Sequence, residues 1–242
     1  MKELRIPGTA IKAPHAWPTH AWFTLAFGAL FAAIAPFNPA FAFLTGGSSL
    51  ARVTVILILG SVGILCARQT GLRIESTGLR RPFLTLLAIA AGVALEIVIV
   101  DCVLFRSMLR PDYVALFRNQ GLGFRTCFFM LAAYVENIEY RLFLMSALVW
   151  VIGSLWRGSD GRPANGAFWT AMTLAQVVNI AVNVVPQAAG PITPLVLAYD
   201  GLRYLFPGVV WGYLYWRHGF VAAEIASVGT HPFLQPQLGY FL

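Results

Sequence analysis

The chain has 242 residues, of which 58% are hydrophobic and only 11% are charged. A soluble domain of this size has about a quarter of its residues charged, so this chain has too little polar surface to cover a fold in water. The strands of a transmembrane β-barrel alternate polar and apolar residues over about ten positions, whereas the apolar runs here are longer and continuous. The composition therefore predicts an all-α protein, a polytopic transmembrane helical bundle.

The net charge of +7 comes mainly from arginine, because Lys2 and Lys12 are the only lysines. The arginines lie between apolar runs rather than on one face, which indicates positively charged cytoplasmic loops and no nucleic-acid partner. Cys66, Cys102 and Cys127 lie in or beside apolar runs and lack the spacing of a disulfide framework or a zinc knuckle. We expect these three cysteines in the core.

Apolar runs define the expected elements in chain order. Residues 1–20 are predicted to be an N-terminal cytoplasmic segment, and residues 21–242 a single membrane domain. The first run, 21–44, contains Pro36 and Pro39, which kink or break helices. The later runs cover 53–67, 82–105, 126–156, 167–186, 193–215 and the residues from 219 onward. Because a span needs ~20 apolar residues, the runs predict about seven spans, with six to eight as the range.

The distribution of basic residues predicts the orientation. With seven spans, the N-terminal side carries ten lysines and arginines and the opposite side carries five, the five being Arg52, Arg106, Arg110, Arg118 and Arg125. Positive residues concentrate on the cytoplasmic side. We therefore expect a multi-pass integral protein of the plasma (inner) membrane with a cytoplasmic N-terminus.

Four ionisable residues lie well inside apolar runs: Glu136, Glu139, Arg141 and Glu224. Each costs about 2.5 to 3.5 kcal/mol at the centre of a bilayer on insertion scales. A structural ion pair and a functional site remain alternatives for any one of them, and Glu224 is a candidate partner of Arg203. The crowding of three such residues into "YVENIEYRLFL" favours a site.

Two further acidic residues, Glu96 and Asp101, lie closer to the end of their run and are expected to reach the membrane interface.

Helix geometry relates the polar residues of this segment to one another. At about 3.6 residues per turn, Asn137 and Arg141 are neighbours that can hydrogen-bond, and Glu136 and Glu139 share a flank. One neutral and one ionised carboxyl beside Arg141 would form a net-neutral triad, and one of them is a candidate general base.

Three segments resemble the motifs of the CAAX prenyl protease and bacteriocin-processing (CPBP, or Abi) family of intramembrane endopeptidases. "ENIEYRLFLMSALVW" is similar to the EExxxR motif of that family, and "FWTAMTLAQVVNIAVNVVP" is similar to its FxxxH segment. "WGYLYWRHGFVAAEIASVGTH" is similar to its third motif. The three occur in the order of the family, and the resemblance covers about residues 80–235.

The resemblance implies site residues position by position. Glu136 and Arg141 match the first glutamate and the arginine of the first motif, and Asn137 replaces the second glutamate. Asn183 replaces the second-motif histidine. An alternative alignment of that motif puts Gln176 there.

In the third motif, Ser227 stands at the histidine and His231 at the acidic or amide position. The imidazole of His231 is therefore a candidate to act from a shifted position.

In the family, the first glutamate and the second-motif histidine activate a water, and the third-motif residues stabilise the oxyanion. The resemblance thus implies an endopeptidase in which Glu136 activates water to hydrolyse a peptide bond of a prenylated or membrane-associated substrate. The replaced histidine favours the alternative, a non-catalytic pseudoprotease that binds a membrane partner, peptide or lipid. The expected partners are membrane lipids and a prenylated or membrane-inserted peptide. Neither a cofactor nor a metal is expected, because the chain contains no HExxH and offers only His231 as an imidazole ligand within its spans.

Overall fold

The computed structural model describes residues 19–34, 48–77, 82–184 and 191–242. Within these ranges the chain is helical, and a single bridge between Arg157 and Pro163 is its one β-type pairing. The prediction of an all-α fold is confirmed. Most of the predicted segment 1–20, and both Pro36 and Pro39 of the first run, lie outside the described residues.

Several helices are continuous through short π-helical sections. The elements in order are α1 (Thr19–Ile34), α3 (Ser49–Thr70), α4 (Pro82–Ile99) with η2 (Val100–Leu104), η3 (Arg106–Met108), α5 (Pro111–Asn119), α6 (Leu122–Asn137) with η4 (Ile138–Met145) and α7 (Ser146–Leu155), α8 (Asn165–Asn179) with η5 (Ile180–Val184), α9 (Pro194–Asp200) with η7 (Gly201–Leu205) and α10 (Phe206–His218), and α11 (Phe220–Phe241).

Four helices are long and apolar enough to cross a membrane: Ser49–Thr70, Phe83–Leu104, Leu122–Leu155 and Asn165–Val184. Their outer faces carry exposed leucine, isoleucine and phenylalanine side chains, as lipid-facing helices do. A membrane protein is therefore supported at this level, while seven spans remain a prediction. The longest of the four has 34 residues, more than the ~20 that a crossing needs.

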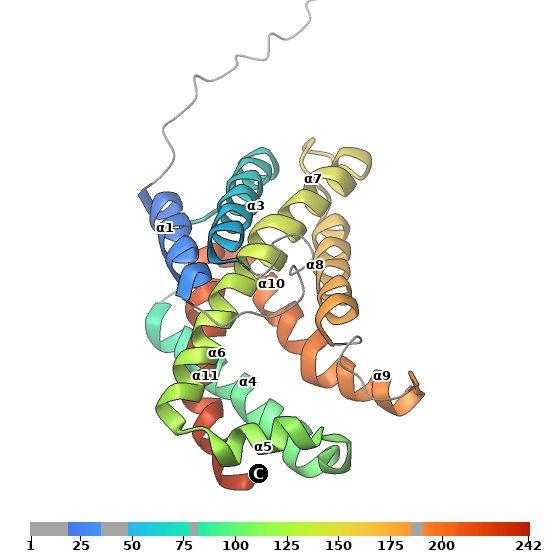
Figure 1. The fold of residues 1–242 in the computed structure, drawn as a ribbon. Coiled ribbons are helices and arrows are strands. Elements are labelled where there is room, and N and C mark those ends of the chain that lie inside the picture. The colour runs from blue at the N-terminus through green and yellow to red at the C-terminus, as the bar shows by residue number, and fades with distance from the viewer. Residues whose placement is uncertain (1–18, 35–47, 78–81, 185–190) are drawn as a thin grey trace, which may run out of the picture.

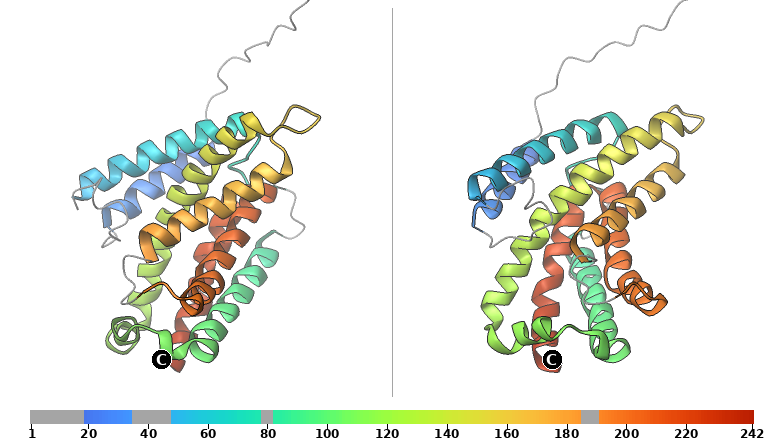
Figure 2. Two further views of the ribbon diagram at one scale, coloured as in Figure 1. Left: turned by 90° about the vertical axis from the view of Figure 1, so that its right-hand side faces the viewer. Right: turned by 45° about the vertical axis from the view of Figure 1, so that its right-hand side comes forward.

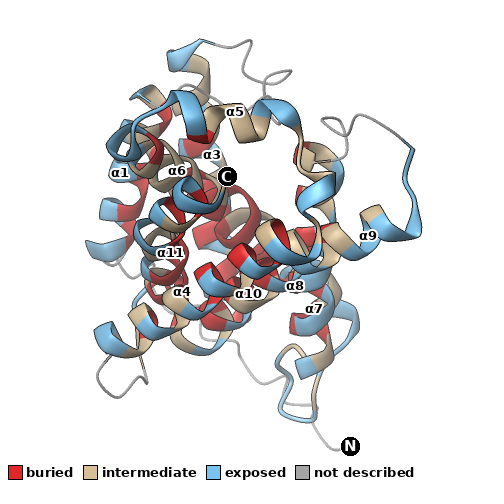
Figure 3. Ribbon diagram, turned by 90° about the horizontal axis from the view of Figure 1, so that it is seen from below, coloured by how far each residue is buried: buried red, intermediate tan, exposed pale blue. Residues whose placement is uncertain are grey.

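The helix formed by α6, η4 and α7 runs through the length of the molecule, from α5 to the far end of α7 (Figure 1). α11 packs against both α4 and α6 and lies between them (Figure 2). α3 packs against α1, η4 and α7. Buried residues gather on the faces that these helices turn toward one another, and exposed residues lie on the outside (Figure 3).

α3 approaches η4 backbone to backbone. A Cβ atom added at Gly63 would lie 2.6 Å from the carbonyl carbon of Leu142 and 2.9 Å from the Cα of Phe143. Small residues at such crossings allow membrane helices to come close. Gly63 therefore sets the distance between α3 and the helix that carries the polar motif.

The junction between α10 and α11 is held by the loop that follows α3. Gly219 has φ +95°, a backbone conformation open mainly to glycine. The amides of Phe220 and Val221 donate to the carbonyls of Arg73 and Ile74, each at 2.9 Å. This pairing fixes where α11 begins and hence where its first turns face the other helices.

Candidate functional site

Glu139 and Arg141 lie in the π-helical section of the long helix formed by α6, η4 and α7. Residues Ile138–Met145 form the π-helix η4, and the facing helices contain the π-helices η5 and η7. A π-helix bonds i to i+5 rather than i+4 and is frequently found at functional sites. The neighbours expected from a regular α-helix are therefore shifted in this segment.

Arg141 is held by a glutamine of another helix rather than by Asn137. The guanidinium is buried, and its Nη2 donates to Oε1 of Gln176 at 2.7 Å. Gln176 in turn donates through Nε2 to the carbonyl oxygen of Tyr204 at 3.1 Å. One glutamine side chain thus links η4, α8 and η7.

A second set of polar contacts joins η4 to η5. Nδ2 of Asn183 donates to the hydroxyl of Tyr140 at 2.8 Å and to Oδ1 of Asn179 at 2.6 Å. All three side chains are buried. Asn183, the residue aligned with the family histidine, therefore contacts the helix that carries Glu136 through the neighbouring tyrosine.

Carboxylates surround the arginine. Glu136 is half-buried and interacts electrostatically with both Glu139 and Arg141. Glu224 reaches the same region from α11, where it lies against Asn137 and Arg141. Among the described residues, the cluster thus combines three carboxyl groups with the guanidinium of Arg141.

Glu224 is the least satisfied member of this cluster. The residue is 7% exposed, its two carboxyl oxygens are buried, and neither has a hydrogen-bond partner within the described part of the chain. The Nδ2 atom of Asn137 is likewise buried without an acceptor there. Asn137 is a close neighbour of Glu224.

The structure does not bring His231 to Glu136. The His231 ring stacks on Phe129, with the ring centroids 5.8 Å apart, and Phe129 lies two helical turns, about 10 Å along the axis, before Glu136. Ser227 is buried on α11 between Glu224 and His231. Of the sequence-predicted site residues, Glu136 and Arg141 therefore share one cluster, Asn183 lies at its edge, and His231 lies outside it.

No family model, curated protein or solved structure matches this chain. The resemblance to the CPBP family rests on the three sequence motifs. Their segments form the end of α6 with η4 and the start of α7, α8 with η5, and α10 with α11, and these helices pack against one another.

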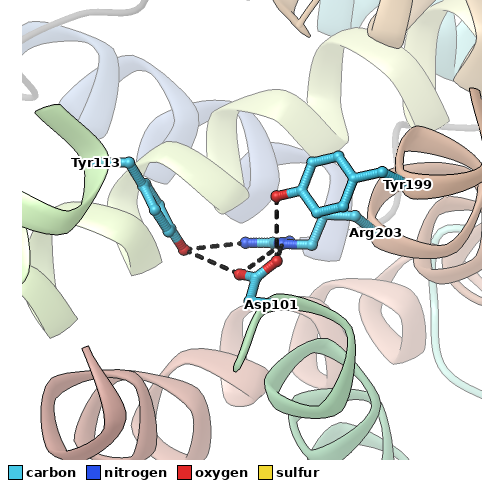
Figure 4. A network of polar contacts seen from close by, with 4 residues as sticks. All are labelled: Asp101, Tyr113, Tyr199 and Arg203. Atoms are coloured by element: carbon cyan, nitrogen blue, oxygen red, sulfur yellow. Dashed lines mark hydrogen bonds and ion pairs between the residues drawn. The ribbon is translucent and has the colours of Figure 1, made fainter. Parts of the chain in front are cut away.

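A separate network surrounds Asp101, which is fully buried (Figure 4). Arg203 donates from Nε to both carboxylate oxygens at 3.0 Å. The hydroxyls of Tyr199 and Tyr113 donate to the same carboxylate at 3.1 and 3.3 Å. The network ties η2 to α5, α9 and η7.

Asp101 is buried beneath α5 and η7, and the oxygens of Glu96 are buried as well, so neither carboxyl group is exposed at the surface of the protein. The network around Asp101 corrects one sequence-based expectation. Arg203 pairs with Asp101 and not with Glu224. The pairing was missed because residues 101 and 203 are far apart in sequence. The signal available was an acidic and a basic residue within apolar runs.

The sequence interpretation passed over Tyr140, it placed Asn179 only at the position of the second-motif phenylalanine, and it ranked Gln176 second. A tyrosine in an apolar run is common and does not stand out. Gln176 was visible only as the alternative alignment of the second motif, yet it is the residue that contacts Arg141.

Among the described residues, no group of three histidine, cysteine, aspartate or glutamate side chains is placed to hold a metal ion.

Proposed function

We propose that this protein is a non-catalytic relative of the CPBP endopeptidases that binds a membrane-inserted or prenylated peptide at the polar cluster around Arg141. The observation that carries the proposal is the bond from Arg141 to Gln176. The amide of Gln176 lies beside the arginine, and the amides of Asn183 and Asn179 bond to each other and, through Asn183, to Tyr140 of η4.

The chemistry of these groups suits binding better than hydrolysis. An amide donates and accepts hydrogen bonds but does not take up a proton at neutral pH. General acid–base assistance is typically worth ~10²–10⁴ in rate, and that assistance would be missing here. An unpaired peptide group in an apolar environment costs several kcal/mol, so a buried cluster of amides and one guanidinium favours binding of a peptide backbone.

The second candidate is a glutamate-dependent endopeptidase, and the placement of Glu136 favours it. Glu136 is half-buried beside a second carboxyl, Glu139, and close to the guanidinium of Arg141. A carboxylate in such surroundings is the kind of group that serves as a general base.

One experiment separates the two. The purified protein in lipid nanodiscs is mixed with a fluorescent prenylated CAAX peptide, and binding and cleavage are measured together. Binding without cleavage, weakened about tenfold or more in Gln176→Leu, supports the binding protein. The matched control is Gln237→Leu, because Gln237 is partly exposed on α11 and its side chain donates to Phe233 within the same helix.

Cleavage by the wild-type protein that disappears in Glu136→Gln would replace the binding proposal with the endopeptidase. Binding that is equal in wild type and Gln176→Leu would refute the assignment of the cluster as the peptide site. Absence of binding, with all variants folded to the same thermal midpoint, would reject both candidates.

The proposed topology has seven spans in the plasma membrane and a cytoplasmic N-terminus, with lipids as the surrounding partners. Support comes from seven long helical stretches in the described residues and from the excess of positive residues on the N-terminal side. A reporter enzyme that is active only outside the cytoplasm, fused within the loop 157–164, should give no signal. The same reporter placed between 105 and 111 should be active.

A further inference from the structure

A cavity of about 240 Å³ lies between α1 and α11. Most of its wall is aromatic or aliphatic, and Glu224 is the only acidic residue among the described residues that line it. Phe23 and Phe27 are 57% and 47% exposed on the outer face of α1, where a membrane helix meets lipid tails. The cavity is lined by His20, Phe23, Phe27, Tyr134, Phe220 and Glu224, among others.

The lining of this cavity includes a buried carboxyl group that lacks a hydrogen bond within the described structure. Glu224 is more than nine-tenths buried, and it lines the cavity itself. A buried polar group without a partner is costly, so such a group facing an open apolar space indicates a ligand that supplies the missing donor.

The charge of the surroundings specifies the donor. Glu136 and Glu224 both lie near the guanidinium of Arg141, which has already bonded to Gln176, and Glu139 lies near Glu136. Unpaired charges are strongly disfavoured inside a protein or bilayer. A cation at Glu224 would therefore offset part of the excess of acidic groups, whereas an anion would add to it.

The walls suit a cation that carries a hydrocarbon tail. Tyr134 and Phe220 place aromatic rings in the same cavity as Glu224, and aromatic faces attract ammonium groups. Phe23 and Phe27 continue the apolar surface outward along α1.

We infer that this cavity, here named the α1–α11 groove, binds the protonated amine of a single-chain amphiphile. The ammonium group lies against Glu224, and the tail runs over Phe23 and Phe27 into the lipid. The inference goes beyond the proposed peptide binding, because it concerns another ligand and stands on the groove and its carboxyl group alone.

The test uses the full-length protein in nanodiscs of phosphatidylcholine. The probe is a long-chain alkylamine with a dansyl group at the far end of its tail, and the reference probe is the alcohol of the same chain. The amine should bind about tenfold or more tightly than the alcohol, as expected for a charge-assisted hydrogen bond. Glu224→Gln should abolish that preference and leave the affinity for the alcohol nearly unchanged.

The matched control is Glu96→Gln, which changes a buried carboxyl outside the groove and should retain the preference for the amine. Val221→Trp provides an independent geometric test, because Val221 lines the groove and the indole would fill it. This variant should weaken binding of both probes, and it decides the question if Glu224→Gln fails to fold.

Equal affinities for amine and alcohol in the wild type would overturn the inference. So would an amine preference that survives in Glu224→Gln, unchanged binding in Val221→Trp, or displacement of the amine by sodium ions, which would identify an inorganic cation as the ligand.

Discussion

Replacement of Gly63 by alanine tests whether the close approach of α3 to η4 holds the polar segment in place. The added Cβ would lie 2.6 Å from the carbonyl carbon of Leu142 and 2.9 Å from the Cα of Phe143. Both atoms belong to the backbone, so no side-chain rotation can relieve the overlap, and the two helices must separate.

The expected magnitude follows from two opposing effects. Alanine is favoured over glycine inside a helix by up to about 1 kcal/mol, which would stabilise the variant. Overpacking of a tight interface costs about 1 to 3 kcal/mol, and the upper end applies because backbone must move. Gly63→Ala should therefore lower the free energy of unfolding by about 1 to 2 kcal/mol.

The control is Gly92→Ala on α4, where a Cβ would meet no atom within 4 Å. That variant should keep the gain in helix propensity and be equal to or more stable than the wild type. Stability is measured as reversible unfolding of the purified protein in mild detergent. If Gly63→Ala is as stable as Gly92→Ala, α3 does not contact η4 at this distance and the reasoning fails.

Three further perturbations have defined outcomes. Asp101→Asn should destabilise the protein by about 3 to 5 kcal/mol, because it leaves Arg203 without its ionic partner inside the protein. The measurement is equilibrium unfolding. A decrease in the free energy of unfolding of less than about 1 kcal/mol would contradict a buried ion pair. Gly208→Ala should weaken peptide binding as Gln176→Leu does, because the added Cβ would overlap the side chain of Gln176; unchanged affinity would show that Gln176 is not needed in its observed position. The guanidinium of Arg110 bonds to the exposed carboxyl group of Asp112 and lowers the pKa of that group. The small contribution of this ion pair to stability therefore exists at neutral pH and disappears as the pH falls through the lowered pKa of Asp112. Thermal midpoints of wild type and Asp112→Asn should therefore differ at pH 7 and converge once the pH is below the lowered pKa of Asp112. A difference that persists in acid would exclude the ion pair as its cause.

Sequence alone was sufficient for the class of the protein. The low charged fraction and the long apolar runs predicted a helical membrane protein, and the described residues are helical with four helices able to span a bilayer. These properties follow from composition because a bilayer forces each spanning segment to satisfy its own backbone hydrogen bonds. The crowding of Glu136, Glu139 and Arg141 into one apolar run was also sufficient to locate the polar cluster, since ionisable groups in such runs are costly.

The partners of those residues were decided by the tertiary structure. Asn137 was predicted to bond to Arg141 from regular helical spacing, but the π-helix η4 shifts the spacing and Gln176 takes that role. Asp101 and Arg203 come together only because α5 and η7 fold over the end of α4. Glu224 faces the α1–α11 groove and not Arg203, because the pairing of Phe220 and Val221 with the loop after α3 sets where α11 begins. Composition reports which residues must be inside a membrane, whereas side-chain partners depend on how separate helices are rotated and packed, and no local pattern in the chain encodes that.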